Sequence, residues 1–531
     1  MISWELFALI PGLILFLYGI ENFSNEIQKV VGDRFRSLLG KLTNTRIKGA
    51  ILGAVVTAIA QSSTATTVIT VGLVNAGVIS FSQSLGVIIG TNVGTTMTAQ
   101  LVAFRLTAIA PLFILLGFLI SLFGKKYRFL GKPIFYFGLV FFSLNIMSDA
   151  IEPFKEDPDI AFLFASFTNV AIALLAGFLF TLIVQSSSVT TGIVVVLAQG
   201  GFISPIQGIP ILLGANIGTT ATSLLASSRM SLHAKRASVA HFLFNFIGVL
   251  LILPFLADFE ELIYMIGGGP AQQVANAHLV FNIIMAIVFL IFIGQFKKAV
   301  ELVVPGTEDE ILFKTKYLNN KLPEDNKEAF GVIEKELGHL FDVSTTLFKE
   351  SMSCINDNND GKTQRVAKLG GLTDFLNKEI EQAILDLSKR KLNANEARKT
   401  ILLVRISNTL EHLSDIAVDL SELSRNMMDT GLSLTPEGVS GLRSIYGKFN
   451  ENMIVLRESF PMIKNEDIDK MRDNDVELRE LTNLDYGDYI NRYLVRKVSS
   501  GSMFIEMVSV IESANYRLRE IRKLLQEYRT L

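Results

Sequence analysis

The chain has 531 residues, half of them hydrophobic, and a formal net charge of −2 at pH 7. This near-neutral total says little about partners, because it hides an uneven distribution of charge along the chain, and no basic patch typical of nucleic-acid-binding proteins stands out. Cys354 is the only cysteine, so an internal disulfide framework is excluded. Residues 1 to about 296 hold few charges, whereas the remainder is rich in charged residues and Asn. The composition therefore indicates two parts of different character.

Long apolar runs fill the first part of the chain. A helix needs about twenty mainly apolar residues to cross a bilayer, and several runs reach or approach this length. They are, in chain order, Trp4–Ile20, Ala108–Phe123, Pro133–Met147, Ala161–Val184, Val239–Leu256 and Ala277–Ile293. We therefore expect an all-α, multi-pass membrane protein. After the first run, Ser24–Leu42 mixes apolar and basic residues at helical spacing and predicts an amphipathic helix on the inner membrane face.

A polar cluster occurs twice within these apolar runs. Gln61-Ser62-Ser63-Thr64-Ala65-Thr66-Thr67 returns as Gln185-Ser186-Ser187-Ser188-Val189-Thr190-Thr191. A second pair follows at the same distance from each, as Gly90-Thr91-Asn92-Val93-Gly94-Thr95-Thr96 and Gly214-Ala215-Asn216-Ile217-Gly218-Thr219-Thr220. The constant offset indicates a duplicated unit, around residues 49–105 and 161–228. Helix packing through small and hydroxyl residues is the simpler alternative, but it does not explain why both clusters recur together.

The distribution of charged residues predicts the orientation of the two copies. Basic residues gather after the first run, at 125–132, at 229–236 and at 297–298, whereas Ile151–Asp159 and Ala257–Glu261 are acidic. By the positive-inside rule, the basic connections lie in the cytoplasm. The first copy then runs from inside to outside, and the second runs in the opposite direction. Inverted repeats of this kind place their polar motifs near the bilayer midplane, at broken or re-entrant helices.

No ionisable side chain lies within either copy. Between Gly49 and Phe104, and between Ala161 and Ser228, there is no Asp, Glu, Lys, Arg or His. A proton relay normally needs such groups, so proton coupling through a carboxylate is disfavoured. Hydroxyl and carbonyl oxygens suit Na⁺, while helix N-termini and hydroxyl donors suit an oxyanion. Because no cationic side chain is present, bound cations would have to balance most of the charge of an anion.

The paired Gln-Ser-Ser motifs, each followed by Gly-x-Asn-x-Gly-Thr-Thr, resemble those of the type II sodium/phosphate cotransporters. The whole chain is similar to the bacterial branch of that family, which carries a C-terminal PhoU-like domain. The resemblance implies sodium-driven uptake of inorganic phosphate across a bacterial plasma membrane. One departure is Thr64, where the first motif of the family usually has Ser. The residues that the resemblance implies in phosphate and sodium binding are Gln61, Ser62, Ser63, Thr64, Thr66, Thr67, Asn92, Thr95, Thr96, Gln185, Ser186, Ser187, Ser188, Thr190, Thr191, Asn216, Thr219 and Thr220.

Two further polar pairs lie in the later apolar runs. His241 and Asn245 are four residues apart, as are His278 and Asn282, so each pair shares one helix face. They predict interhelical hydrogen bonds, with a polar lining of the transport core as the alternative. Three acidic residues near the ends of the apolar runs are expected at the membrane interface: Glu5, Glu21 and Asp149.

The charged second part shows long helical patterns that predict an antiparallel helix bundle. They are broken near Asn356–Gly361, Asn393–Asn395, Gly431–Glu437 and Ser499–Gly501. Two apolar stripes predict its core, Leu369, Leu372, Leu376, Ile380 and Ile384 in one helix, and Leu402, Ile406, Leu410, Leu413, Ile416 and Leu420 in the next.

One segment of this bundle, Asn408–Ile416, is similar to the signature helix of PhoU-like proteins, in which carboxylates four residues apart hold metal clusters. Glu411 and Asp415 have this spacing and therefore share a helix face. At the expected companion position, however, Glu512 is followed by Tyr516. A solvated or salt-bridged face is favoured over a metal site.

We therefore expect a transport domain at residues 1–300, a linker at 301–325 and a cytoplasmic PhoU-like regulatory domain at 326–531. The expected function is symport of phosphate into the cell, without catalysis, with Na⁺ as the coupling ion and no further cofactor. Two alternatives stay open, namely import of another oxyanion and a membrane sensor that binds phosphate without moving it. The expected surroundings are a lipid bilayer. The expected protein partners are a second copy of the chain or a cytoplasmic regulator bound through the PhoU-like domain, and no nucleic acid is expected.

Overall fold

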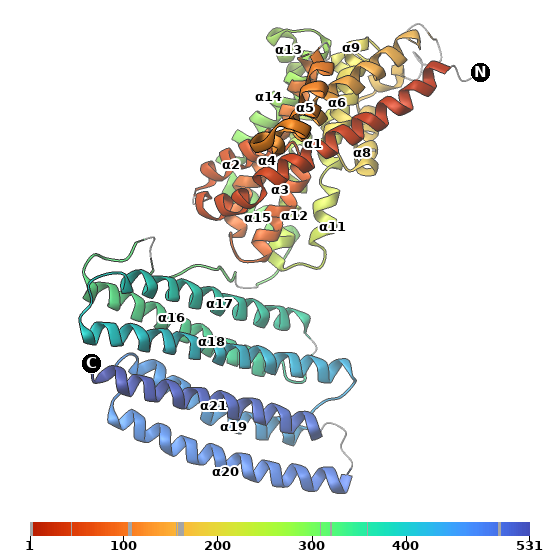
Figure 1. Ribbon diagram of the computed structural model, residues 1–531. Helices are drawn as coiled ribbons and strands as arrows, with labels where there is room; N and C mark the ends of the chain where they lie inside the picture. Colours follow the sequence, from red (N-terminus) through yellow and green to blue (C-terminus); the bar gives the residue numbers. More distant parts are fainter. Residues whose placement is uncertain are drawn as a thin grey trace. The chain divides into compact units, whose positions relative to one another are not determined.

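The computed structural model describes residues 4–43, 45–104, 109–154, 157, 164–307, 310–318, 321–357, 359–496 and 501–531. Its regular elements are helices throughout, and no strand occurs among these residues, so the all-α prediction is confirmed. The chain divides into two compact units, Met1–Glu310 and Ile311–Leu531. Figure 1 labels the helices of each unit.

The first unit begins with α1 (Trp4–Leu42), a single long helix that is clearly visible in Figure 1. The apolar run Trp4–Ile20 and the predicted amphipathic helix Ser24–Leu42 are therefore one continuous element, and the prediction of two separate helices was wrong. The one proline inside α1 is Pro11, which lies within the first run. No proline therefore stands between the two segments to break the helix. The side chains of Glu5 and of residues 30–42 lie outside the described part of the chain, so the amphipathic face stays a prediction.

The first copy of the repeat forms what we call the first hairpin: α2 (Arg46–Ala60), α3 (Ser63–Asn75) and α4 (Phe81–Ala103). Ser80 and Gln83 form a capping box that starts α4. α2 packs closely along α4, because a Cβ atom added at Gly90 would lie 1.9 Å from the carbonyl oxygen of Ala50. Only glycine permits such a close backbone approach.

The second copy forms the second hairpin: α8 (Val170–Val184), α9 (Ser187–Gly200) and α10 (Pro205–Gly218). It repeats the local devices of the first hairpin, since Ser204 and Gln207 form the capping box of α10. A Cβ atom added at Gly214 would lie 1.9 Å from the carbonyl oxygen of Leu174. The copies differ at one end: α4 is continuous, whereas the second copy breaks after Gly218 and resumes as α11 (Ala221–Ser227).

The other helices of this unit complete the apolar framework. They are α5 (Ala110–Phe123), α6 (Arg128–Ile151), α12 (Leu232–Ile252), α13 (Leu256–Ile266), α14 (Pro270–Ile291) and α15 (Ile293–Val303). Among the described residues, five helical stretches are long and apolar enough to cross a membrane: Phe81–Ala103, Arg128–Phe154, Pro205–Ser227, Leu232–Ile266 and Pro270–Ile291. The membrane-spanning character predicted from the apolar runs is confirmed at this level.

Two boundaries expected in this region were wrong. The acidic stretch Ala257–Glu261, expected as a loop, lies inside α13, because its apolar neighbours continue the helical spacing. The apolar run Ala161–Val184 is not one helix, since α8 begins at Val170 after Asn169 caps it by accepting from the backbone N–H groups of Ala171 and Ile172. Residues 161–163 lie outside the described residues, as do residues 155, 156, 158 and 159 of the acidic connection after Ile151.

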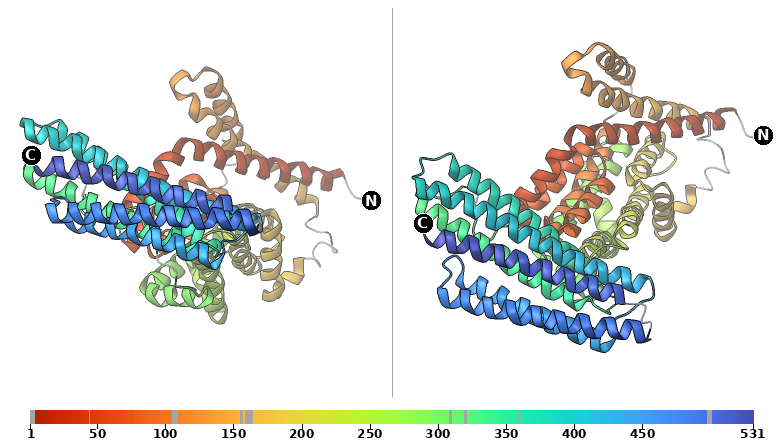
Figure 2. Two further views of the ribbon diagram at one scale, coloured as in Figure 1. Left: turned by 90° about the horizontal axis from the view of Figure 1, so that it is seen from below. Right: turned by 60° about the horizontal axis from the view of Figure 1, so that its bottom comes forward.

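The second unit is a bundle of long helices that lie side by side in both views of Figure 2. They are α16 (Asn326–Ser353), α17 (Asp360–Ser388), α18 (Ala394–Asp429), α19 (Pro436–Ser459), α20 (Asn465–Arg496) and α21 (Gly501–Arg529). The helix-bundle prediction is confirmed. The helix ends agree with the predicted breaks, but one further break, between Ser459 and Asn465, was missed. Pro461 lies in it and cannot donate a helical hydrogen bond.

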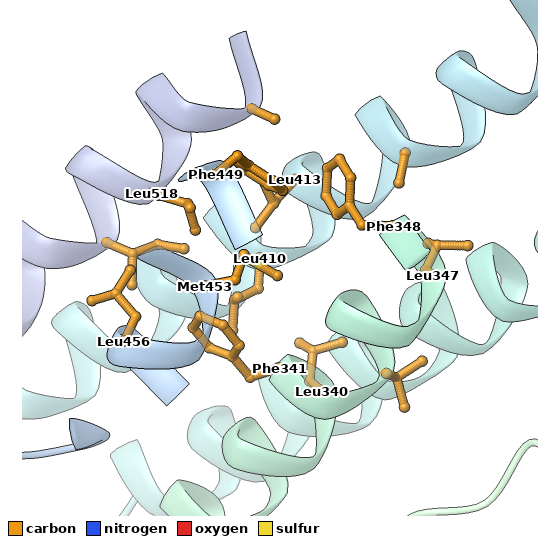
Figure 3. Packing of buried hydrophobic residues seen from close by; sticks show 14 of the residues in the cluster. Leu340, Phe341, Leu347, Phe348, Leu410, Leu413, Phe449, Met453, Leu456 and Leu518 are labelled. Carbon is orange, nitrogen blue, oxygen red and sulfur yellow. The ribbon is translucent and has the colours of Figure 1, made fainter. Parts of the chain in front are cut away.

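The core of the bundle consists of the predicted apolar stripes together with residues of the other helices. Leu376, Leu410 and Leu413 are fully buried, whereas Ile416 is only partly buried. Figure 3 shows Leu340 and Phe341 of α16 beside Leu410 of α18 and Met453 of α19. Residues of both predicted stripes belong to this one core cluster, as their spacing predicts.

The segment that leads into α16 is held by Glu336. Its fully buried carboxylate accepts hydrogen bonds from the backbone N–H groups of Lys316, Tyr317 and Leu318, at 2.6 to 3.0 Å, and lies 2.9 Å from the imidazole Nδ1 of His339. Burial alone would raise the pKa of Glu336, but these hydrogen bonds hold it below its usual range. The charged carboxylate thus fixes the start of the bundle.

Candidate functional site: a cavity shared by two polar turns

The turn between α2 and α3 has an unusual backbone. Gln61 ends α2 in the left-handed conformation, with φ 52° and ψ 29°, and its backbone N–H donates to the carbonyl of Thr57. Ser62 is extended and caps α3, because its hydroxyl accepts the backbone N–H of Ala65 at 3.2 Å. A left-handed conformation costs a non-glycine residue about 1 kcal/mol. Strain of this kind gathers at functional sites, where the side chain is needed despite its cost.

The turn between α8 and α9 repeats this backbone closely. Gln185 ends α8 with φ 57° and ψ 23°, and Ser186 is extended, as Ser62 is. The side chains differ, because the hydroxyl of Ser186 makes no capping bond to α9. Instead, Thr190 of α9 lies with its hydroxyl 2.6 Å from that of Thr181 in α8. The same backbone therefore carries two different hydrogen-bond patterns.

Both turns line a single cavity of about 510 Å³. The motif residues at its wall come from the tips of the two hairpins, and they are Gln61, Ser62, Ser63, Thr64, Gln185, Ser186, Ser187 and Ser188. The first residues of α3 and α9 are among them, so the positive ends of two helix dipoles lie at one cavity. Backbone N–H groups at helix N-termini, joined by hydroxyl donors, form a favourable setting for an oxyanion.

Thr98 of α4 connects the two turns. Its hydroxyl donates to the Oε1 atom of Gln61 at 2.8 Å and lies 3.4 Å from the hydroxyl of Ser188. The Nε2 atom of Gln61 donates to the carbonyl of Ala58 within α2. Thr98 was not among the predicted site residues. The repeat could have indicated this position, because Thr98 and Thr222 are separated by the same offset as the motifs.

A third wall of the cavity comes from α1. Leu17, Ile20, Glu21, Ser24, Asn25 and Gln28 all line it. Ser24 attaches this helix to the first hairpin, because its hydroxyl donates to the carbonyl of Ala60 at 2.9 Å and accepts from Nε2 of Gln28 at 2.9 Å. None of these residues was among the predicted site residues, and Glu21 was expected at the membrane interface. Their helical spacing shows that they share a face but not what that face contacts.

The remaining predicted site residues do not line the cavity. Several are buried and bond within their own helix, as when Asn92 donates to the carbonyl of Ile88 at 2.9 Å and Thr95 to that of Thr91 at 2.9 Å. Those placed away from the cavity wall are Thr66, Thr67, Asn92, Thr95, Thr96, Thr190, Thr191, Asn216, Thr219 and Thr220. The second motif instead lies where α4 and α10 pack against α2 and α8, around Gly90 and Gly214.

The two histidines of the later helices make the interhelical contacts that were predicted. His278 of α14 lies with its Nε2 atom 3.0 Å from the Oδ1 atom of Asn216 in α10. His241 of α12 lies with its Nδ1 atom 3.4 Å from the hydroxyl of Ser223 in α11. Asn245 and Asn282 donate to the carbonyls of His241 and His278 in their own helices. These pairs support helix packing behind the second hairpin, and none of them lines the cavity.

Comparison with known proteins identifies this architecture. The family model described as Na⁺/Pi-cotransporter matches twice, at residues 15–149 and 150–291, and together these matches cover more than half of the chain. The chain belongs to the Na⁺/Pi-cotransporter family. The model of the PhoU domain matches residues 337–424. The resemblance stated from the motifs is confirmed, and no solved structure matches the chain.

Three relatives show what this family member is similar to. The uncharacterized protein YqeW of Bacillus subtilis is 32% identical over 268 residues, which cover 50% of this chain and 87% of YqeW. The "Putative inorganic phosphate export protein YjbB" of Escherichia coli is 24% identical over 456 residues, 84% of this chain and 83% of YjbB. The human "Sodium-dependent phosphate transport protein 2C" is 48% identical over 85 residues, 15% of this chain and 14% of that protein.

The PhoU domain of this cotransporter-family chain holds the predicted carboxylate pair. Glu411, His412 and Asp415 of α18 bring one ligand atom each within 4.8 Å of the others, a grouping found once among the described residues. Burial and the charge of Asp415 raise the pKa of Glu411, while burial and the charge of Asp374 raise the pKa of Asp415. Carboxylate and imidazole groups are common metal ligands, and the neighbouring carboxylates repel one another. A divalent cation would relieve this repulsion.

The companion position differs. Burial raises the pKa of Glu512, and the nearby positive charges of Arg519 and Arg479 partly offset this effect. The surroundings of Glu512 are therefore basic and do not favour a cation. The interpretation favoured from the sequence, a solvated or salt-bridged face at Glu411 and Asp415, stays a prediction, with the metal site as its alternative.

Proposed function

We propose that this chain couples Na⁺ to the movement of inorganic phosphate through the cavity between the two polar turns. The observation that carries the proposal is the meeting of two helix N-termini with five serines, one threonine and two glutamines of the polar turns at one cavity, in a member of the Na⁺/Pi-cotransporter family. Phosphate would be held by the N-termini of α3 and α9 and by the hydroxyls of Ser62 and Ser186. Na⁺ would bind to hydroxyl, amide and carbonyl oxygens of the same turns.

In this proposal the motif residues have two roles. Those at the cavity wall, from Gln61 to Thr64 and from Gln185 to Ser188, contact phosphate or Na⁺. Those buried behind it, such as Asn92 and Asn216, keep the hairpins closely packed so that the two turns face one another. The membrane is a bacterial plasma membrane, and the PhoU domain lies in the cytoplasm, where it regulates transport.

The direction of net transport has two candidates. Uptake follows from the resemblance to sodium-driven phosphate importers. Export is favoured by the YjbB proteins, because the name assigned to them refers to phosphate export and their similarity extends over 84% of this chain. Both directions use the same cavity and differ in which gradient drives the cycle.

The test is flux of labelled phosphate in proteoliposomes that contain the purified full-length chain. An imposed sodium gradient should drive phosphate in the same direction as sodium, and a potassium gradient of equal size should not. Ser62→Ala and Ser186→Ala should each lower the flux at least about tenfold, the loss expected for one charge-assisted hydrogen bond. Thr222→Val is the control, because Thr222 does not line the cavity.

Several results would contradict the proposal. Phosphate flux that ignores sodium would exclude the coupling, and sulfate that competes as well as phosphate would exclude the substrate. Phosphate binding without any flux would make the chain a sensor. In whole cells, net uptake under an inward sodium gradient supports import, whereas net loss from phosphate-loaded cells supports export.

A further inference from the structure

One acidic side chain faces the shared cavity. Glu21 of α1 is the single formally charged residue among the described residues that line it; the others are apolar, hydroxyl or amide side chains. The two copies of the repeat contain no ionisable residue, so the carboxylate reaches the cavity from outside the repeat. It lines the same cavity as the turns that carry the N-termini of α3 and α9.

The position of Glu21 is set by contacts of its own helix. Ser24, one turn further along α1, donates to the carbonyl of Ala60, the residue that precedes Gln61. Gln28 donates to Ser24 and continues the same face. The face of α1 that carries Glu21, Asn25 and Gln28 is therefore attached to the first turn, and the three side chains place carboxylate and amide oxygens along one wall.

A second carboxylate of α1, that of Glu26, is paired with basic side chains, unlike that of Glu21. Glu26 lies 2.7 Å from the ammonium group of Lys29 and 3.9 Å from that of Lys132, and it does not line the cavity. Glu21 has no hydrogen bond or ion pair with any described residue, and its side chain is exposed and lines the cavity. Its charge is therefore not balanced by the protein surface that the structure describes.

An unbalanced carboxylate beside an anion site has a definite electrostatic effect. It repels phosphate and attracts a cation, and both effects are weakened where water reaches the charges. A cation bound at the carboxylate removes the repulsion and adds attraction for the anion. Binding of the cation then raises the affinity for phosphate, and binding of phosphate raises the affinity for the cation by the same factor. This reciprocal change in affinity is thermodynamic coupling.

We propose that Glu21 is the anionic ligand of a monovalent cation site in the cavity, completed by amide oxygens of α1 and hydroxyl oxygens of the polar turns. This inference rests on the proposed function, since it names the group that makes phosphate binding depend on Na⁺. It also revises the expectation that only neutral oxygens are available to the cation.

The test measures sodium binding without phosphate, so that it does not require transport. Binding of ²²Na⁺ to the purified full-length chain in nanodiscs is compared for the natural protein, Glu21→Gln, Glu21→Asp and Glu26→Gln. The sodium concentration for half-maximal binding should rise roughly tenfold in Glu21→Gln, the change expected for loss of one charged ligand. It should rise less in Glu21→Asp and stay within about twofold in the matched control Glu26→Gln.

Phosphate flux supplies the second readout. In Glu21→Gln the sodium dependence of flux should shift to higher concentration, while the phosphate affinity at saturating sodium should not weaken. The inference is overturned if Glu21→Gln and Glu26→Gln bind sodium alike. It is also overturned if Glu21→Gln changes the pH dependence of flux but not its sodium dependence, because Glu21 would then carry a proton. Should Glu21→Gln fail to fold, as judged by size-exclusion chromatography, Glu21→Asp decides between these results.

The two proposals can fail separately. If the natural protein binds sodium at Glu21 but moves no phosphate, the proposed function is wrong and the cation site stands. If sodium drives phosphate flux equally well in Glu21→Gln, the cation site is wrong and the proposed function stands.

Discussion

The two polar hairpins share a backbone and differ in their hydrogen bonds. Gln61 and Gln185 both end their helices in the left-handed conformation, with φ of 52° and 57°. Gly90 and Gly214 both touch the facing backbone, and both later helices begin with a capping box. Yet Ser62 caps α3 whereas Ser186 makes no capping bond, and Thr181 pairs with Thr190 in the second hairpin alone.

This difference indicates which features the duplicated unit needs. The shared backbone keeps each turn at the cavity, while the side chains have diverged toward different contacts. In the first hairpin more of the polar atoms are used for structure, since Ser62 caps and Gln61 accepts from Thr98. In the second, the hydroxyl of Ser186 is not used for capping, which leaves it more available to a ligand.

The largest expected effect concerns the glycines that hold the hairpins closed. Gly90→Ala and Gly214→Ala should each lower the free energy of unfolding by about 3 kcal/mol, because the added methyl group would sit 1.9 Å from a backbone oxygen and force two helices apart. Reversible denaturation in detergent measures this. Gly72→Ala is the control, since nothing lies within 4 Å of its added Cβ. Equal losses support equivalent hairpins, and a loss at only one position would break the comparison.

The left-handed glutamines should respond in opposite ways. Gln185→Gly should raise the free energy of unfolding by about 1 kcal/mol, because glycine adopts this backbone without strain. Gln61→Gly also removes the backbone strain, but it loses the hydrogen bonds to Ala58 and Thr98. Its free energy of unfolding should therefore be about 2 kcal/mol lower than that of Gln185→Gly. Both variants should lose phosphate flux. Equal stability of the two would show that the side-chain bonds of Gln61 contribute nothing.

Thr98 and Thr222 test whether the connection between the turns belongs to one copy only. Thr98→Val should lower the free energy of unfolding by about 1.5 kcal/mol, because the buried Oε1 atom of Gln61 loses its donor. Thr222→Val, at the matching position, should change it by less than about 0.5 kcal/mol. The same denaturation experiment checks both. A larger effect at Thr222 would contradict the asymmetry seen here.

The smallest expected effect separates structure from binding at the serines. Ser62→Ala should lower the free energy of unfolding by about 1 kcal/mol through loss of the helix cap. Ser186→Ala should leave stability within about 0.5 kcal/mol, since its hydroxyl makes no capping bond. Melting curves, measured beside the phosphate flux of each variant, test this. A stability loss in Ser186→Ala would mean that this hydroxyl has a structural partner after all.

Much of the membrane unit could be predicted because its signals are local. The duplicated Gln-Ser-Ser cluster predicted a break in each copy, and the breaks occur at Gln61 and Gln185. The apolar stripes of the bundle were predicted equally well, because Leu376 and Leu410 are buried as their spacing requires. The missed break near Pro461 and the helix that includes Ala257–Glu261 show the limit of this method. A helix boundary depends on packing as well as on composition.

The amino-acid sequence by itself determined the two alike hairpins, since equal local patterns of glycine, serine cap and glutamine impose equal backbones. Only the tertiary structure decided which polar residues share a cavity. Ser24 meets Ala60 across 36 positions of the chain, and Thr98 meets Ser188 across 90, and no periodicity encodes such contacts. The placement of Glu21 belongs to this second kind. Helical spacing shows which residues share a helix face with this carboxylate. It does not show which residues of other helices contact that face.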